Sequence, residues 1–391
     1  MMAAQGIREF EIDIEDLLSH FESLEDPRSE VNRRHPLESV IIISIMAILA
    51  GAGGPTAIAL WAKNKEDWLS PLLPLPHGVP KKDVYRRVLM AVNPQAFQAC
   101  FNQWLQSHYE RVAEENGITR PLLNIDGKTL RRSHDRANGL GALHSVSVWA
   151  GEFGMTLAQV ACEEKSNEIT AIPEVLKMVE VKDAVVTIDA MGTQKKIAKQ
   201  IIDAGGDYVL ALKGNQKGLH KEIVAYIDEQ MLNDFEGIGA RKYITQEKGH
   251  GRDEQRIYVQ MPVPKHLAGK EKWKGLKTVG VVMLMTVRDG KETFDTRYYI
   301  SSLRMSVKLF ARSVRGHWSI ENSCHWCLDF IYREDESRIR QKNLRENFAW
   351  LNRFTFSLIK QYPSKQSQVM KRRICGWNED YLLQVLTNTT T

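Results

Sequence analysis

The sequence predicts an α/β fold preceded by an all-helical region, because the hydrophobic pattern changes character along the chain. Apolar residues recur at helical spacing through much of residues 10–115. Short apolar or alternating runs, typical of strands, begin near residue 121, and helical segments separate the later ones. A chain of 391 residues is also long enough for more than one domain.

The helical region contains one nearly continuous apolar run, over residues 40–50. It is too short for a membrane span, which needs roughly 20 residues, so we expect a buried helix and then a second helix over residues 56–69. Residues 81–91 and 94–115 predict two more helices. This last pair is either an ordinary helical hairpin or a helix-turn-helix that reads DNA. Four basic residues on the first of the two helices slightly favour DNA: Lys81, Lys82, Arg86 and Arg87.

Five strand-like runs follow, at residues 122–125, 144–149, 156–161, 184–188 and 208–212. Three strands in succession, then strands alternating with helices, are the order of an RNase H-like sheet. Further strand-like runs at residues 255–260, 278–287 and 293–300 predict a β-rich insertion, and residues 331–385 are predicted helical. The predicted domains are a helical N-terminal domain (1–118), an RNase H-like catalytic core in two parts (119–217 and 299–385), and the β-rich insertion (218–298) between those parts.

The composition is that of a globular protein, with 43% hydrophobic and 26% charged residues. The net charge of +5 is uneven, because residues 1–30 hold nine acidic and two basic residues, which leaves +12 on the remaining chain. This favours a body that binds a polyanion, although a solvated acidic helix explains the count equally well. The five cysteines and the acidic first 30 residues predict a protein of the reducing cytoplasm.

Three acidic residues stand where a metal-dependent nuclease needs them. Asp126 and Asp189 each end an apolar strand-like run, and Glu321 lies in a segment with a helical pattern. Two carboxylates at the ends of neighbouring strands and one from a facing helix can hold two cations about 4 Å apart, one on each reacting oxygen of a phosphodiester. Such an all-oxygen site suits Mg²⁺ or Mn²⁺. A single Asp after a strand is more often a turn residue than a metal ligand. The prediction of a metal site therefore depends on all three acidic residues together.

Six short blocks hold most of these residues: Ile125-Asp-Gly-Lys128, Lys165-Ser-Asn-Glu-Ile-Thr-Ala-Ile-Pro173, Thr187-Ile-Asp-Ala-Met-Gly-Thr-Gln194, Ala211-Leu-Lys-Gly-Asn-Gln216, Lys248-Gly-His-Gly-Arg252 and His317-Trp-Ser-Ile-Glu-Asn322. They resemble the signature blocks of bacterial insertion-sequence DDE transposases, most closely those of the H-repeat-associated branch. The resemblance extends from about residue 20 to about residue 385.

This resemblance implies an enzyme that cuts DNA at the ends of its own element and joins the freed strands to target DNA. It implies two Mg²⁺ ions, or Mn²⁺, in each active site, with Asp126 bridging both, Asp189 holding one and Glu321 the other. Terminal-repeat DNA, target DNA and a second copy of the chain are the implied partners. The implied location is the bacterial cytoplasm, at the nucleoid, and residues 1–118 would recognise the DNA end.

Several cationic or polar residues near these blocks are candidate DNA contacts, since Lys and Arg contacts to phosphate give affinity. Relatives have a Lys seven residues after the Glu where this chain has Leu328, and Arg315 is a candidate for the missing cation. His317 is expected to reach the same phosphate or to orient Glu321. The full set is Lys128, Arg131, Arg132, Lys213, Asn215, His250, Arg252, Arg315, His317 and Trp318. Alternatively, these charged residues lie in solvated loops without contacting DNA, and His317 and Trp318 only pack against the protein core.

Trp273 and the pair Cys324 and Cys327 each have a structural and a functional interpretation. Trp273 is either buried in the insertion or free to stack on an unpaired base. Cys324 and Cys327 face the core or belong to a zinc site, and the sequence offers no evident second ligand pair for zinc. For the whole chain, the alternative functions are a domesticated DNA-binding protein with a silent nuclease, and a stand-alone nuclease without strand transfer.

Overall fold

The structure is a computed structural model that describes residues 18–135, 139–162, 168–249 and 251–387. Residues 1–17, most of the acidic leading segment, lie outside this description, as do residues 165–167 of one predicted block and His250. The chain divides into two compact units. The first comprises Met1–Ile118, Gly127–Asn167 and Asn322–Thr391, and the second comprises Thr119–Asp126 and Glu168–Glu321.

The first unit begins with the predicted helices. The apolar run forms α2 (Leu37–Leu49), whose side chains are almost all buried, and it ends before the glycines as expected. The helix predicted over residues 56–69 is present as two helices, α3 (Pro55–Asn64) and α4 (Glu66–Leu69). The other two predicted helices are confirmed as α5 (Lys82–Ala91) and α6 (Pro94–Glu115). The Asn93 side chain accepts hydrogen bonds from the first turn of α6 and so fixes where that helix starts. Among the described residues, every helix is too short or too polar to cross a membrane.

The C-terminal part of the first unit is helical, as predicted, and its centre is α12 (Lys342–Gln361). This helix is buried along most of its length and packs against α2, α5, α6 and the strand β3. Phe101 of α6 and Phe354 of α12 have ring centroids 4.4 Å apart. The N-terminal helices therefore share one hydrophobic core with α12. The remaining elements of this part are α11 (Trp326–Tyr332), α13 (Gln368–Trp377) and α14 (Glu379–Thr387).

The predicted strands are all present, in a mixed sheet with the order β3-β2-β1-β4-β5-β9-β8-β7-β6. In the first unit, β2 (Leu143–Ala150) and β3 (Met155–Cys162) form an antiparallel pair. In the second unit, β4 (Val185–Ile188) lies parallel to both β1 and β5, the latter spanning Asp207–Leu212. The predicted helices between these strands are α7 (Glu168–Leu176) and α8 (Lys195–Asp203). The strand β1 spans Leu122–Leu130 and is longer than the predicted run.

The described part of residues 217–301 contains one α-helix, α9 (Lys217–Met231), a short 3-10 helix (Lys270–Lys272) and four long antiparallel strands. The predicted runs correspond to β7 (Arg252–Pro262), β8 (Thr278–Arg288) and β9 (Lys291–Ser301), and β9 pairs with β5. The strand β6 (Arg241–Gly249) was not predicted, because most of its residues are polar and exposed. Trp273, between β7 and β8, is only 3% exposed, so its interpretation as an accessible stacking platform is wrong and the buried alternative holds.

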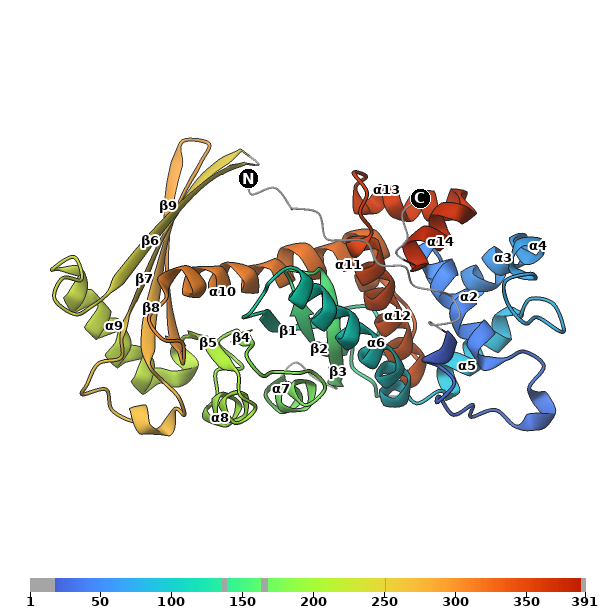
Figure 1. Cartoon of the computed structure of the whole chain (residues 1–391), viewed down its shortest axis with the longest axis horizontal. Coiled ribbons are helices and arrows are strands. Elements are labelled where there is room, and N and C mark those ends of the chain that lie inside the picture. Colours follow the sequence, from blue (N-terminus) through green and yellow to red (C-terminus); the bar gives the residue numbers. More distant parts are fainter. Residues whose placement is uncertain (1–17, 136–138, 163–167, 250, 388–391) are drawn as a thin grey trace. The chain divides into compact units, whose positions relative to one another are not determined.

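One helical segment leads to Glu321. The helix α10 (Val307–Ser319) continues into a π-helix, η6 (Ile320–His325). Within the second unit, α10 packs against β4, β5, β6 and β7, and it lies on the opposite face of the sheet from α7 and α8 (Figure 1). At Gly316 a Cβ atom would lie 2.7 Å from the Leu122 side chain, so glycine allows α10 to approach β1 closely.

Candidate active site

Asp126 and Asp189 occupy equivalent places on neighbouring parallel strands. Ile125 of β1 pairs with Ile188 of β4, so each aspartate is the next residue after a paired position. Adjacent strands lie about 4.8 Å apart, which brings the two aspartates to one edge of the sheet. Only Asp189 ends its strand, because β1 continues through Asp126 to Leu130. The prediction that Asp126 ends its strand, as Asp189 does, is therefore wrong.

The Asp189 carboxylate is held by the turn that follows it. Its Oδ1 accepts hydrogen bonds from the backbone N–H groups of Met191 (3.0 Å) and Gly192 (3.2 Å). A Cβ on Gly192 would come within 2.6 Å of side chains of both Ile188 and Ile172, so the turn has room only for glycine. Burial raises the pKa of Asp189 above its ordinary value, although the hydrogen bond from Gly192 opposes this. A cation at this carboxylate would restore the ionised form.

Glu321 lies in the first turn of the π-helix η6. A carboxylate oxygen of Glu321 lies within 4.8 Å of one from Asp126. The same π-helix ends at His325. Carboxylate oxygens are common ligands of Mg²⁺ and Mn²⁺, so the pair of Asp126 and Glu321 fits such an ion. Short π-helical turns are rare and are frequently found at functional sites.

The structure thus brings Glu321 to Asp126, while Asp189 lies on the neighbouring strand and is not part of the same cluster of potential ligands. Sequence reasoning missed Glu168 at the start of α7, which is 5% exposed and whose negative charge also raises the pKa of Asp189.

A chain of hydrogen bonds links the strands to α10 next to these carboxylates. The Thr187 hydroxyl donates to the side-chain oxygen of Asn124 (2.7 Å) and also lies 3.0 Å from Nδ1 of His317. A hydroxyl has one proton, so Thr187 must accept from Nδ1–H of His317. This contact fixes the orientation of the imidazole ring. Asn124 and Thr187 each precede a catalytic candidate by two residues, so His317 is fixed to the strands that carry them.

Two other candidates on α10 have partners from the β-strands. Arg315 donates to the Glu247 carboxylate of β6 at 3.0 Å, and Arg256 of β7 contacts the same oxygen at 3.0 Å. Trp318 lies against the guanidinium of Arg297, whose central carbon is 3.7 Å from the ring centroid. Arg315 remains about half exposed, so a phosphate could still approach it.

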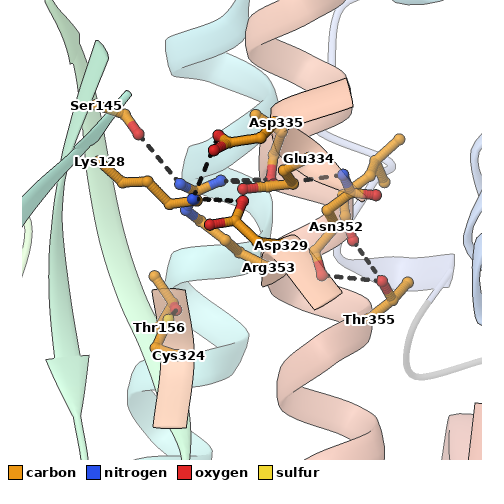
Figure 2. A network of polar contacts seen from close by, with 12 residues as sticks. Lys128, Ser145, Thr156, Cys324, Asp329, Glu334, Asp335, Asn352, Arg353 and Thr355 are labelled. Carbon is orange, nitrogen blue, oxygen red and sulfur yellow. Dashed lines mark hydrogen bonds and ion pairs between the residues drawn. The ribbon is translucent and has the colours of Figure 1, made fainter. Parts of the chain in front are cut away.

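Lys128 lies within β1, not in a loop, and its side chain is only 6% exposed. Its Nζ is 2.6 Å from Oδ1 of Asp329 on α11 and 3.7 Å from Oδ1 of Asp335 (Figure 2). Arg131, just beyond the strand, is 3.2 Å from the other oxygen of Asp335. This ion cluster joins the strand that carries Asp126 to the helix that follows Glu321.

A fully buried ion pair lies beside that cluster. Nη1 of Arg353 on α12 is 3.1 Å from Oε1 of Glu334, and both side chains are 0% exposed (Figure 2). Asn352 donates to the same Glu334 oxygen, and Nη2 of Arg353 is 3.2 Å from the Ser145 hydroxyl on β2. These contacts hold β2, the segment after α11, and α12 together.

The remaining predicted residues have varied surroundings. Arg132, Lys213 and Asn215 are exposed, and the Asn215 amide donates to the backbone oxygen of Ala190, next to Asp189. Arg252 is half exposed and contacts Glu254. Cys324 and Cys327 are buried as the core alternative predicted, and burial raises the pKa of Cys324 to about 12, which disfavours the thiolate that zinc binds.

Known proteins resemble this chain over nearly its whole length. Residues 117–358 match the family described as Transposase DDE domain, and residues 18–105 match the one described as DDE_Tnp_1-associated. The chain is 36% identical to "Putative transposase YncI" of Escherichia coli O157:H7, over 96% of this chain and 95% of that protein. It is 32% identical to "H repeat-associated putative transposase YhhI" of Escherichia coli K12, over 97% and 99%.

Among solved structures, a piggyBac transposase synaptic complex with hairpin DNA aligns with 97% of this chain and 83% of its own, at a TM-score of 0.35 and 11% identity. A score this low does not identify a shared fold. The match to the DDE domain covers more than half of the chain, and the two relatives above span nearly all of it. This chain therefore belongs to the DDE transposase family.

Proposed function

We propose that this protein cuts phosphodiester bonds at the ends of an insertion sequence and joins the freed 3′-hydroxyls to target DNA. The observation that carries the proposal is the meeting of Asp126 and Glu321, whose potential ligand atoms lie within 4.8 Å although 194 residues separate them in the chain. Like charges this close repel, so a cation between them is the simplest reason for the arrangement.

In this proposal Asp126 contributes to both metal positions, Asp189 to one and Glu321 to the other. Mg²⁺ or Mn²⁺ bound there would activate the attacking oxygen and stabilise the leaving oxygen. Asp189 is oriented by the N–H groups of Met191 and Gly192, and its raised pKa favours a cation partner. His317, which lies 3.0 Å from the Thr187 hydroxyl through Nδ1, would orient the reacting water or hydroxyl or hold the DNA end.

The strand order β3-β2-β1-β4-β5 supports an RNase H-like core, formed by residues 119–217 and 299–385. Residues 218–298, with α9 and most of the four long strands, would be the β-rich insertion. We propose that residues 1–118 recognise the DNA end. The match of residues 18–105 to a domain associated with the DDE domain supports this role.

The DNA would pass the edge of the sheet where Asp126 and Asp189 lie. Lys213 and Asn215 are exposed in the loop after β5, and the charge of Lys213 acts on Asp189, so both are placed to contact phosphate. Arg131, Arg132, Arg252, Arg315 and Trp318 are proposed contacts of lower rank, since most of them already have protein partners. Two element ends must be held together, so we propose a homodimer on DNA.

Strand cleavage of terminal-repeat DNA by the full chain, with Mg²⁺ or Mn²⁺, tests the proposal. We expect Asp126→Ala, Asp189→Ala and Glu321→Ala each to abolish cleavage while retaining DNA binding. Asp228→Ala is the matched control, because Asp228 is an exposed acid on α9 of the same unit. Full cleavage by any of the three variants would remove that residue from the site.

The alternatives predict other outcomes in the same assay. A domesticated DNA-binding protein would bind the repeats without cutting them. A stand-alone nuclease would cut, but it would not join a 3′-hydroxyl to a second duplex. Strand-transfer products made by the wild-type chain and lost in Glu321→Ala would exclude both.

A further inference from the structure

We propose that Trp326 and Phe330 form a stacking platform for an unpaired DNA base, and that Arg373 contacts a phosphate of the same strand. All three residues belong to the first unit. The inference adds a binding site to the proposed cleavage site, and it rests on the proposed function only in taking DNA as the partner.

The platform is an aromatic pair on the solvent side of α11. Trp326 and Phe330 are four residues apart, which places them on one face of the helix. Their rings are stacked, with centroids 4.9 Å apart and an angle of 9° between the ring planes. Trp326 is 58% exposed and Phe330 is 61% exposed, whereas Cys327, Leu328 and Tyr332 of the same helix are buried. Adjacent exposed aromatic side chains are typical of a surface that binds a partner.

A pocket of about 300 Å³ adjoins the platform, because Phe330 belongs to its wall. Ala50 and Gly51, at the end of α2, and Arg373 of α13 contribute to the other walls. A Cβ on Gly376 would lie 3.1 Å from the backbone oxygen of Ala50, so glycine lets α13 pack closely against the end of α2. The volume is at the lower end of pockets that take small ligands, which suits a single nucleotide better than a longer segment.

The helix α13 makes the surroundings of the pocket positive. Residues 363–377 contain four basic residues and no acidic residue. Two of the four have structural partners, since Lys371 donates to the backbone oxygen of Ile359 and Arg372 donates to that of Ile48. Arg373 is exposed, so its guanidinium can contact a phosphate.

An unpaired nucleotide matches this combination of aromatic surface and positive charge. Every base has a flat face that can stack on Trp or Phe, and an Arg contact to phosphate adds affinity. In a double helix the bases stack on one another, so only a base that has left the duplex can lie on the platform. A symmetric contact between two copies of the chain would bring α13 close to its own equivalent, and the like charges would repel.

Binding of fluorescein-labelled oligothymidine by the full chain in EDTA, followed by fluorescence anisotropy, tests the proposal. We expect Trp326→Ala and Phe330→Ala each to weaken binding at least about fivefold, the lower limit for the loss of one stacking contact. Trp326→Phe should keep most of the affinity. Phe294→Ala is the matched control, because it removes an aromatic side chain of β9 that is 74% exposed, and it should bind like the wild type.

The salt dependence of binding tests the phosphate contact separately. For Arg373→Ala the slope of log K against log salt should become shallower by about 0.7, the value for one phosphate contact on a single strand. Arg373→Lys keeps the charge and should keep the slope. An unchanged slope in Arg373→Ala would overturn the assignment of Arg373.

A photochemical cross-link gives a readout that needs no variant. With 5-iododeoxyuridine in the oligonucleotide, irradiation of the wild-type complex should produce an adduct on Trp326 or Phe330, located by mass spectrometry. Cross-links only at other residues, or equal affinities of the wild type and Trp326→Ala, would overturn the inference. Weaker self-association of Trp326→Ala with unchanged affinity for the oligonucleotide would instead assign the platform to a contact between copies. The assay contains no metal ion, so these negative results would leave the proposed cleavage site standing.

Discussion

At the scale of single residues, the buried ion pair of Glu334 and Arg353 predicts a large effect on the free energy of unfolding. Both are 0% exposed, and the pair shares hydrogen bonds with Asn352 and Ser145. We expect Glu334→Gln to lower the free energy of unfolding by about 3–5 kcal/mol, because it leaves the Arg353 charge buried without a counter-charge. Urea unfolding measures this. Glu336→Gln is the control, since Glu336 pairs with Arg333 in solvent. An equal loss in both variants would contradict the prediction.

Glu247 predicts a dependence of stability on pH. Burial raises its pKa, but the charges of Arg315 and Arg256 outweigh burial, so the pKa lies below its ordinary 4.5. A carboxylate with a lowered pKa stabilises the fold above its ordinary pKa, and this contribution is lost as the pH falls through the folded-state pKa. The stability difference between the wild type and Glu247→Gln should therefore be present at neutral pH and shrink below about pH 4.5. A difference that does not change with pH would show that the ion pair contributes nothing.

Among the elements, β1 and α11 are joined by the ion pair of Lys128 and Asp329. Lys128 was predicted to contact phosphate, but its burial favours a positioning role. We expect Lys128→Met to lower kcat for cleavage, because Asp126 is two residues away on the same face of β1. The KM for DNA and the salt dependence of binding should hardly change, and the exchange Lys128→Asp with Asp329→Lys should restore part of kcat.

A phosphate contact would give the opposite result. In that case Lys128→Met would weaken DNA binding, and the slope of log K against log salt would fall by about 1. Arg132→Ala is the matched comparison, since Arg132 is exposed just after the same strand.

The strands and helices with regular hydrophobic patterns could be predicted, and so could the edge where Asp126 and Asp189 lie. The strand β6 could not, because most of its residues are polar and exposed; it pairs with β7. The burial of Lys128 depends on Asp329, 201 residues away, and the position of Glu321 depends on a π-helix. Hydrophobic periodicity contains no information about either.

On the scale of the whole molecule, the first unit joins segments from both ends of the chain. The helices α2, α5 and α6 bury apolar surface against α12, as the contact between Phe101 and Phe354 shows. A fragment of residues 1–118 lacks α12, so it should show no cooperative thermal transition by circular dichroism. Addition of residues 322–391 should restore part of the structure. A cooperative transition of the fragment alone would instead support an independent N-terminal domain.

Anomalous diffraction from Mn²⁺ in crystals of the full chain with terminal-repeat DNA tests the central claim most directly. The account predicts two anomalous peaks, one between Asp126 and Glu321 and the other between Asp126 and Asp189, with the scissile phosphate next to both. The same crystals of Glu321→Gln should lose the first peak. Anomalous peaks away from these three carboxylates, with the scissile phosphate bound elsewhere, would contradict it.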